Sequence, residues 1–239
     1  MGVRIMQVIH AEDIKKPSAL RILYGNPGLG KTSTIQYMPG KKLVFDIDGT
    51  SSVLKGLPNI DIVQVNPNSI REELPKLLQE VQENYLDDYD SFALDNISEL
   101  ENAVLTEYGK KGNNHGVPGI QNYQQLQFFE LDLIRYMKAW NKQVLITAWE
   151  TTDQYVEESS GQSFTRSYPQ IRKPILMNVM GLALQVGRLS INPKSGQRGV
   201  WLAPTNSIFA KNQLDNRKAC KVEELFKGEN TDGKEAKNH

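Results

Sequence analysis

The sequence predicts an α/β protein with a mostly parallel central sheet, helices on both faces and a C-terminal antiparallel hairpin. Three observations lead to this prediction. An apolar run meets a glycine-rich turn and a helical pattern over residues 20–38. Apolar strand segments then alternate with amphipathic helical segments as far as residue 150, the order of βαβ units with parallel strands. Two extended segments separated by a Pro- and Gly-containing turn follow at 182–203 and predict the hairpin.

The glycine-rich turn, GNPGLGKT, begins at Gly25 and matches G-x-x-x-x-G-K-[ST]. Its glycines allow several backbone N–H groups to point inward and bind an anion. Lys31 supplies a positive charge for the β- and γ-phosphates, Thr32 offers a hydroxyl to Mg²⁺, and the following helix directs its dipole at the phosphates. The alternative is a glycine-rich turn with an incidental lysine. The predicted cofactors are ATP and Mg²⁺, and the predicted nucleotide-binding residues are Gly25, Asn26, Pro27, Gly28, Leu29, Gly30, Lys31, Thr32 and Ser33.

Composition excludes several other classes of site. The chain has 239 residues, 39% of them hydrophobic, which is enough for one main core. Lys plus Arg and Asp plus Glu are both 28, so nucleic-acid binding must come from local patches. One cysteine, Cys220, excludes an internal disulfide framework, and three scattered histidines lack metal-ligand spacing. Without an apolar run of membrane-spanning length or a signal-peptide pattern, we expect a soluble, cytoplasmic protein with no membrane partner.

Two later strands end in acids. Residues 42–49 form an apolar segment that ends at Asp48, and residues 89–96 form another that ends at Asp95. A carboxylate at the second position can hold Mg²⁺ together with Thr32, so Asp95 is predicted as a metal residue.

Further strands are expected at 60–65 and 143–150, helices at 69–85, 97–108 and 124–140, and irregular segments at 109–123 and 151–174. Residues 1–18 are expected to form a strand or a docking arm, and 227–239 a disordered tail.

The order of these features resembles the RecA-like P-loop ATPases, most closely the small phage-encoded members that act in single-strand annealing or recombination. The resemblance runs from about residue 19 to 217, and we expect a RecA-like core over 19–226. It depends on GNPGLGKT, on VFDID and FALDNISEL, on ITAWE, and on FAKNQ at residues 209–213.

The resemblance implies roles for further residues. An acid past the second strand activates water, and Asp48 is the nearest candidate; the alternative is a solvated strand end. Glu150 lies where the family senses the γ-phosphate, or it could act as a general base. Lys211 matches a cation that reaches the phosphates of the adjacent subunit, which implies a homo-oligomer with ATP between subunits. Gln213 replaces the family's second cation, and Arg217 could substitute for it.

Two family loops that bind single-stranded DNA correspond to residues 109–123 and 151–174. In the second loop cations interleave with aromatic residues, a pattern that can neutralise phosphates and stack on bases. The alternative is that the aromatic residues cover the core and the cations are solvated. The predicted nucleic-acid residues are Lys110, Lys111, Phe164, Arg166, Tyr168, Arg172 and Lys173.

The function predicted from these features is a DNA-dependent ATPase that binds single-stranded DNA and promotes annealing or homologous recombination. A single-strand-binding protein is a further expected partner, and a phage-encoded protein would work in the host cytoplasm. The alternatives are a helicase, a helicase loader, a packaging-type motor, or a slow nucleotide-gated module that binds a protein.

Overall fold

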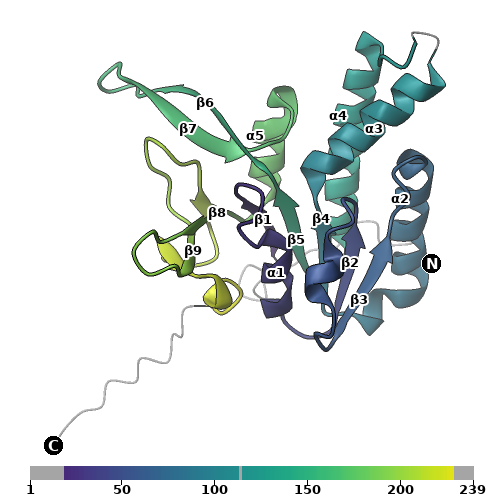
Figure 1. The fold of residues 1–239 in the computed structure, drawn as a ribbon, viewed down its shortest axis with the longest axis horizontal. Coiled ribbons are helices and arrows are strands. Elements are labelled where there is room, and N and C mark those ends of the chain that lie inside the picture. Colours follow the sequence, from purple (N-terminus) through teal and green to yellow (C-terminus); the bar gives the residue numbers. More distant parts are fainter. Residues whose placement is uncertain (1–18, 113–114, 229–239) are drawn as a thin grey trace, which may run out of the picture.

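A computed structural model describes residues 19–112 and 115–228, and within them nine strands form one sheet in the order β11-β9-β8-β1-β5-β4-β2-β3, with β10 beside β8 (Figure 1). The neighbours from β8 to β3 are all parallel, whereas β9, β10 and β11 are antiparallel to their neighbours. The predicted α/β fold with a C-terminal antiparallel hairpin is therefore confirmed. The sheet strands are β1 Leu20–Tyr24, β2 Lys42–Asp46, β3 Ile60–Gln64, β4 Ser91–Asp95, β5 Gln143–Ala148, β8 Gln185–Ile191, β9 Arg198–Trp201, β10 Lys211–Asn212 and β11 Ala219–Lys221.

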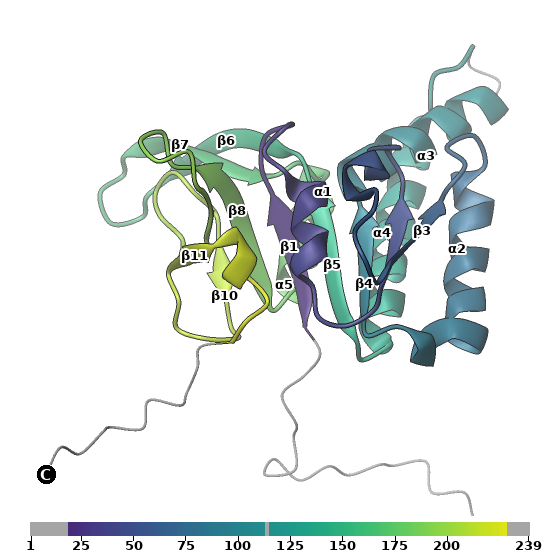
Figure 2. The same ribbon diagram turned by 60° about the horizontal axis from the view of Figure 1, so that its bottom comes forward.

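Helices cover both faces of the sheet, with α2, α4 and α5 behind it and α1 in front of it in Figure 2. The α-helices are α1 Lys31–Thr34, α2 Ile70–Glu80, α3 Ile97–Lys111, α4 Ile120–Ala139 and α5 Lys173–Leu182. Shorter helical turns cover Ile35–Tyr37, Ser51–Leu54, Val81–Tyr85, Leu86–Asp88 and Val222–Glu224. No helix in the described ranges combines the length and the apolar character that crossing a membrane requires.

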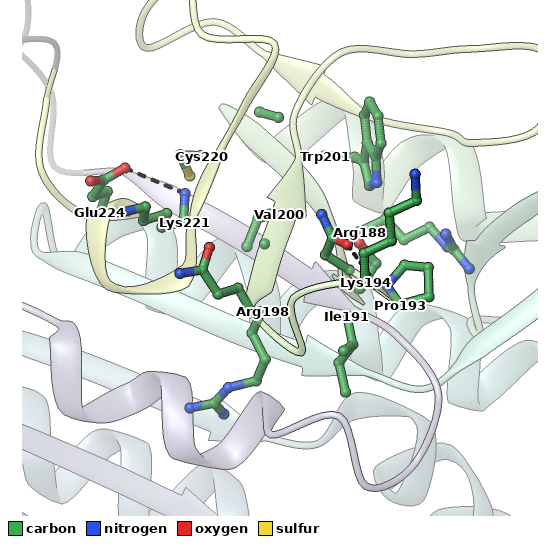
Figure 3. A pocket seen from close by; sticks show the side chains of 15 residues that line it. Arg188, Ile191, Pro193, Lys194, Arg198, Val200, Trp201, Cys220, Lys221 and Glu224 are labelled. Carbon is green, nitrogen blue, oxygen red and sulfur yellow. Dashed lines mark hydrogen bonds between the residues drawn. The ribbon is translucent and has the colours of Figure 1, made fainter.

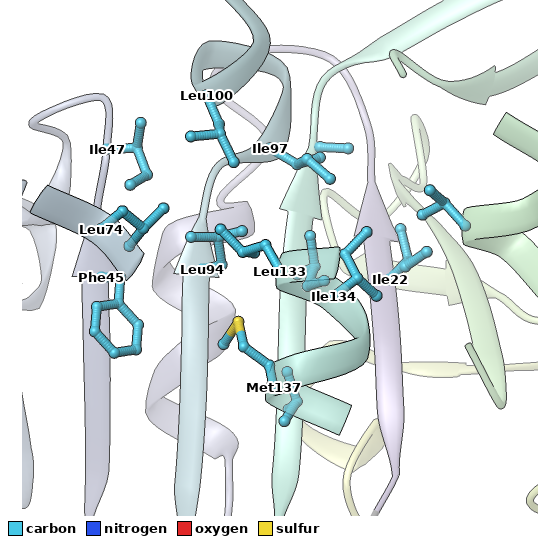
Figure 4. Close-up of a cluster of buried hydrophobic side chains, with 14 of the residues drawn as sticks. Ile22, Phe45, Ile47, Leu74, Leu94, Ile97, Leu100, Leu133, Ile134 and Met137 are labelled. Atoms are coloured by element: carbon cyan, nitrogen blue, oxygen red, sulfur yellow. The ribbon is translucent and has the colours of Figure 1, made fainter. Parts of the chain in front are cut away.

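The strands are apolar on both sides, which places them between two hydrophobic layers. In β1, Ile22 and Tyr24 belong to the larger buried cluster, under α2 to α5, whereas Leu23 belongs to the smaller one, under α1. Phe45 and Leu94 repeat this pattern in β2 and β4 and face the larger cluster (Figure 4). Strands that are apolar on both faces are typical of the centre of a parallel sheet.

The sheet order fixes where functional groups can meet. β5 lies between β1 and β4, and β4 lies beside β2. All four strands are parallel, so their carboxyl ends share one edge. The glycine-rich turn after β1, the acid at the end of β4 and the segment after β2 therefore lie at that edge.

The expected irregular segment at 109–123 is helical at both of its ends. α3 continues to Lys111 and α4 already begins at Ile120, so a short connection joins them. The end of α3 is stabilised because the buried Glu107 carboxylate accepts hydrogen bonds from the backbone N–H of Arg71, at 3.0 Å, and from Lys111, at 2.8 Å. Arg71 is distant from Glu107 in sequence, and Lys111 lies at the helix end. The composition of residues 109–123 therefore did not reveal that α3 continues to Lys111.

The prediction of an irregular segment at 151–174 was also wrong. It forms a two-stranded antiparallel sheet, β6 Glu150–Val156 and β7 Ser163–Pro169, followed by the first residues of α5. Glu157 closes the turn by donating its N–H to the carbonyl of Gln162, and Gly161 adopts a positive φ of 68°. The Thr and aromatic residues of both strands, separated by a Ser-Ser-Gly turn, were the missed signal. The predicted arm at 1–18 and the predicted tail from 229 onward lie outside the described residues.

Candidate nucleotide-binding site

The turn after β1 has the backbone that its glycines predict. Gly28 and Gly30 have φ values of 81° and 91°, in the left-handed region that favours glycine. Gly25 is required for space instead, because a Cβ there would lie 2.9 Å from the carbonyl oxygen of Leu189 on β8. Conformation and close packing thus explain the three glycines.

Lys31 begins α1 and is buried. Its amine donates to the carbonyl oxygens of Gly25, at 2.9 Å, and Asn26, at 3.1 Å, so the side chain folds back across the turn. Burial lowers the pKa of this amine, whereas the carboxylates of Asp95 and Asp48 act in the opposite direction. The lysine charge is therefore enclosed by the turn and close to both acids.

A pocket of about 540 Å³ opens beside the turn. It brings together one side of the phosphate-loop motif and the ends of β2, β4 and β5. Its lining residues are Pro27, Gly28, Gly30, Lys31, Thr32, Ser33, Asp48, Thr50, Val53, Asp95, Asn96, Glu99 and Trp149. The structure thus places Lys31, Thr32, Asp48 and Asp95 around one cavity.

Asp95 has the surroundings of a cation ligand. It is 1% exposed, and one carboxylate oxygen accepts a hydrogen bond from the Thr147 hydroxyl. The other oxygen, Oδ2, is buried and has no hydrogen-bond partner among the described residues. Burial raises the pKa of this carboxyl, and the hydrogen bond from Thr147 opposes that shift. An unpartnered buried carboxylate oxygen and a nearby hydroxyl are hard oxygen donors that suit Mg²⁺, so these residues fit the metal.

Asp48 is positioned by its neighbours. One carboxylate oxygen accepts from the Thr50 hydroxyl, at 2.6 Å, and the other accepts from the Asn96 side-chain amide. Asn96 also caps α3, because its Oδ1 accepts the N–H of Glu99 at 2.8 Å. A hydrogen bond of 3.2 Å between the Thr50 and Thr32 hydroxyls links this group to the phosphate loop.

Comparison with known proteins agrees with this geometry. A family model described as "AAA domain" matches residues 19–214. The chain belongs to this AAA domain family. No curated protein matches the sequence significantly. Together with the phosphate-loop motif and the pocket described above, family membership identifies the chain as an AAA domain with a P-loop.

Two solved structures are similar to this AAA domain. The RadB recombinase is 14% identical, with a TM-score of 0.47 over 78% of this chain and 80% of that one. A KaiC-like protein from the hyperthermophilic archaeon Pyrococcus horikoshii OT3 is 11% identical, with a TM-score of 0.43 over 77% of this chain and 78% of that one.

Glu99 is a pocket residue that the sequence reasoning did not identify. It is half-buried in the first turn of α3, and its carboxylate accepts from the Asn102 amide at 3.2 Å. The available signal was its position four residues after Asp95, within the turn that follows a strand ending in an acid. The AAA domain therefore has two carboxylates, Asp48 and Glu99, that line the pocket besides Asp95.

Three residues with roles implied by the family are engaged elsewhere in this AAA domain. Glu150 forms a bidentate ion pair with Arg188, with distances of 2.8 to 3.1 Å, and is not among the described residues that line the pocket. Lys211 donates to three carbonyl oxygens at the end of α5, the shortest bond being 2.7 Å to Ala183. Arg217 pairs with Asp215 at 2.6 Å.

The residues predicted to contact nucleic acid lie in two regions. Lys110 and Lys111 are in the last turn of α3, where Lys110 donates to Asn68 at 2.8 Å and Lys111 pairs with Glu107. The other residues lie on or just after β7, and each has a contact within the chain. Arg166 stacks on Tyr155, Phe164 is opposite Tyr155, Tyr168 stacks on Phe209, Arg172 lies over Tyr123, and Lys173 pairs with Asp153.

Proposed function

We propose that this AAA domain is a Mg²⁺-dependent ATPase that binds single-stranded DNA and promotes annealing or homologous recombination, as in small phage-encoded proteins. The observation that supports ATP hydrolysis is the pocket that gathers Lys31, Thr32 and Asp95, with Oδ2 of Asp95 buried and unpartnered. These are the groups that bind a triphosphate and its metal in P-loop ATPases.

Each residue has a distinct task in the proposed reaction. Lys31 and the backbone N–H groups of the loop bind the phosphates and stabilise the charge that develops on them. Thr32 and Asp95 would hold Mg²⁺, which when bound would supply positive charge that offsets the negative charge of the phosphates. Asp48 orients the attacking water, because Asn96 and Thr50 fix its carboxylate at the pocket wall. Glu150 does not take this role, because its carboxylate is committed to Arg188.

The β6–β7 hairpin is the proposed DNA-binding element. Its two ends are attached to the pocket wall at Trp149, whose carbonyl accepts the N–H of Gln170 at 2.8 Å and whose N–H donates to Ser98 at 2.9 Å. The Ser98 hydroxyl in turn donates to the carbonyl of Gln170 at 2.7 Å. A change at the pocket wall would therefore move both ends of the hairpin.

The hairpin presents aromatic rings and cations on which bases and phosphates could bind. The Arg166 guanidinium lies 3.1 Å from the centre of the Tyr155 ring, and Phe164 is opposite Tyr155 across the strand pair. Stacking on such rings is tolerant of base sequence. This arrangement supports binding of single strands rather than readout of a particular sequence.

The experiment is ATP turnover with and without single-stranded DNA in the wild type and four variants. We expect Lys31→Ala to abolish turnover, and Arg166→Ala and Tyr155→Ala to retain basal turnover but lose the DNA response. Lys76→Ala is the matched control, because Lys76 is an exposed cation on α2, away from the hairpin (Figure 1). Unchanged DNA stimulation in Arg166→Ala would contradict its assigned role.

A nucleotide-gated module that binds a protein is the second candidate. Asp153, Glu157 and Glu158 place negative charge on β6 and its turn, and Asp153 already pairs with Lys173 at 2.5 Å. Acids would repel DNA phosphates but would suit a basic protein surface. Turnover that requires Lys31 and does not respond to DNA at any salt concentration would favour this candidate.

A further inference from the structure

The β8–β9 hairpin packs directly on the phosphate loop. A Cβ built on Gly25 would lie 2.9 Å from the carbonyl oxygen of Leu189, and one built on Gly30 would lie 2.0 Å from Nη1 of Arg198. Figure 3 shows the Arg198 side chain extending from the hairpin toward α1. The guanidinium therefore touches the last glycine of the loop, one residue before Lys31.

Strand geometry determines this direction. Side chains two residues apart on a strand share a face. Val200 and Leu202 are buried in the cluster under α1, together with Leu189 of β8. Arg198 precedes Val200 by two residues in β9, so it faces the same side and reaches the loop.

Arg198 lines a separate pocket from the one beside Lys31, and its charge is available to a ligand. None of the ion pairs formed within residues 19–112 and 115–228 involves it. By contrast, Arg188 is paired with Glu150, and the amine of Lys211 is occupied by the end of α5. Arg198 is thus an uncompensated guanidinium that touches the phosphate loop.

We propose that Arg198 is a second phosphate-binding cation, which donates hydrogen bonds to the polyphosphate of ATP bound by Lys31 of the same chain. This inference rests on the proposed ATPase function and deepens it. A guanidinium matches phosphate oxygens with two parallel N–H donors, whereas an amine acts as a point charge. Lys31 and Arg198 would approach the polyphosphate from two different elements, α1 and β9.

The test measures the binding of a fluorescent ATP analogue, with inorganic tripolyphosphate as competitor, to the full chain. Arg198→Met keeps much of the side-chain volume and removes the charge. We expect its affinity for both ligands to fall about tenfold to a hundredfold, the range for a lost charge-assisted hydrogen bond. Its affinity should also depend less on salt than that of the wild type, because one ligand-facing charge is gone. Lys194→Met, an exposed cation in the turn of the same hairpin, is the matched control and should bind both ligands normally.

The outcomes separate this inference from the ATPase assignment. If the wild type binds ATP through Lys31 but Arg198→Met binds tripolyphosphate as tightly as the wild type, Arg198 does not bind phosphate and the ATPase assignment stands. Weaker binding with an unchanged salt dependence would also overturn the inference, because it would show lost loop packing. If the wild type binds neither ligand, the ATPase assignment fails, and this inference fails with it.

Discussion

Asp95 shows how burial prepares a carboxylate for a cation. Its Oδ1 accepts a hydrogen bond from Thr147, while Oδ2 faces no partner in the described part of the chain. Burial without a cation raises the pKa of the group, because the charged form loses its hydration. A metal ligated by Asp95 would offset that cost.

Asp95→Asn tests this account, because the amide keeps the shape and the hydrogen bond to Thr147 but loses the charge. We expect Mg²⁺-dependent turnover to fall by about 100-fold or more, with the unfolding temperature of the unliganded protein little changed. Steady-state turnover against Mg²⁺ concentration measures the effect. Asp61→Asn, at a half-exposed surface acid, is the control, and equal turnover of the two variants would contradict the metal role.

Among single residues, the sequence predicted those whose functional group is identified by the segment in which they lie. The phosphate loop contains its own glycines, lysine and hydroxyl, and Asp95 ends a recognisable strand, so these residues could be predicted. Arg198 could not, because its nearness to Gly30 depends on β8 pairing with β1, two segments more than 150 residues apart. Only the sheet order brings them into contact.

Among the elements, α3 and α4 bury a pair of acids. Glu101 on α3 and Glu130 on α4 are both enclosed, and Glu101 accepts the N–H of Arg172 at 2.6 Å. Burial raises the pKa of Glu101 to about 7, although Arg172 acts in the opposite direction. Burial and the neighbouring Glu101 raise the pKa of Glu130 well above its usual range. The pair therefore binds protons in the folded state that it would release on unfolding near neutral pH.

The free energy of unfolding should therefore depend on pH. An acid with a raised folded-state pKa stabilises most below its unfolded value of 4.5 and loses that contribution as pH rises through about 7. We expect stability to fall over this window, by up to about 1.4 kcal/mol per pH unit for each proton. Glu130→Gln should flatten the dependence and raise stability at pH 8.

Urea unfolding between pH 4.5 and 8 measures this effect. Glu80→Gln, at an exposed acid of α2, should leave the slope unchanged. A wild-type slope that persists in Glu130→Gln would mean that other groups are responsible.

Lys211 caps the C-terminal end of α5. Its amine donates to the carbonyl oxygens of Met180, Gly181 and Ala183, which α5 leaves unpaired. We expect Lys211→Met to lower the unfolding free energy by about 1–2 kcal/mol, because these bonds to a charged donor are lost. Lys218→Met, at an exposed lysine seven residues later in the chain, is the control in the same urea experiment.

If Lys211 instead contacts the phosphates of a neighbouring subunit, a different result is expected. Turnover per chain should rise with protein concentration in the wild type but not in Lys211→Met. Unchanged stability together with that kinetic result would favour the subunit role over the helix cap.

For the whole molecule, the nucleotide pocket joins parts of the chain that are distant in sequence. The phosphate loop, β2, β4 and the β5–β6 junction all contribute to its wall. A ligand that binds this folded arrangement and not the unfolded chain stabilises the protein by mass action. MgATP at about 100 times its dissociation constant should raise the unfolding temperature by about 5–10 °C in the wild type.

Lys31→Ala should lose this shift, and Lys76→Ala should retain it. Thermal unfolding followed by circular dichroism, with and without MgATP, measures both. An equal shift in Lys31→Ala would mean that the nucleotide binds away from the phosphate loop.

At the scale of the fold, the sequence predicted the layers better than the connections. Apolar strands alternating with helices identified the sheet, and its acid-ended strands meet at one edge as expected. The hairpin at β6–β7 was missed because its strands are half-exposed and polar, so they lack the apolar runs that revealed the core strands. Its structure depends instead on cross-strand pairs such as Tyr155 with Phe164.

Trp149 lies in the pocket wall and is therefore an intrinsic fluorescent probe of this site. The chain has three tryptophans in three environments: Trp140 is enclosed in the core, Trp201 is 42% exposed, and Trp149 lines the nucleotide pocket. Replacing Trp201 with phenylalanine would leave emission from the core and the pocket wall. Any change in fluorescence on adding nucleotide would then report occupancy in real time, without an attached dye.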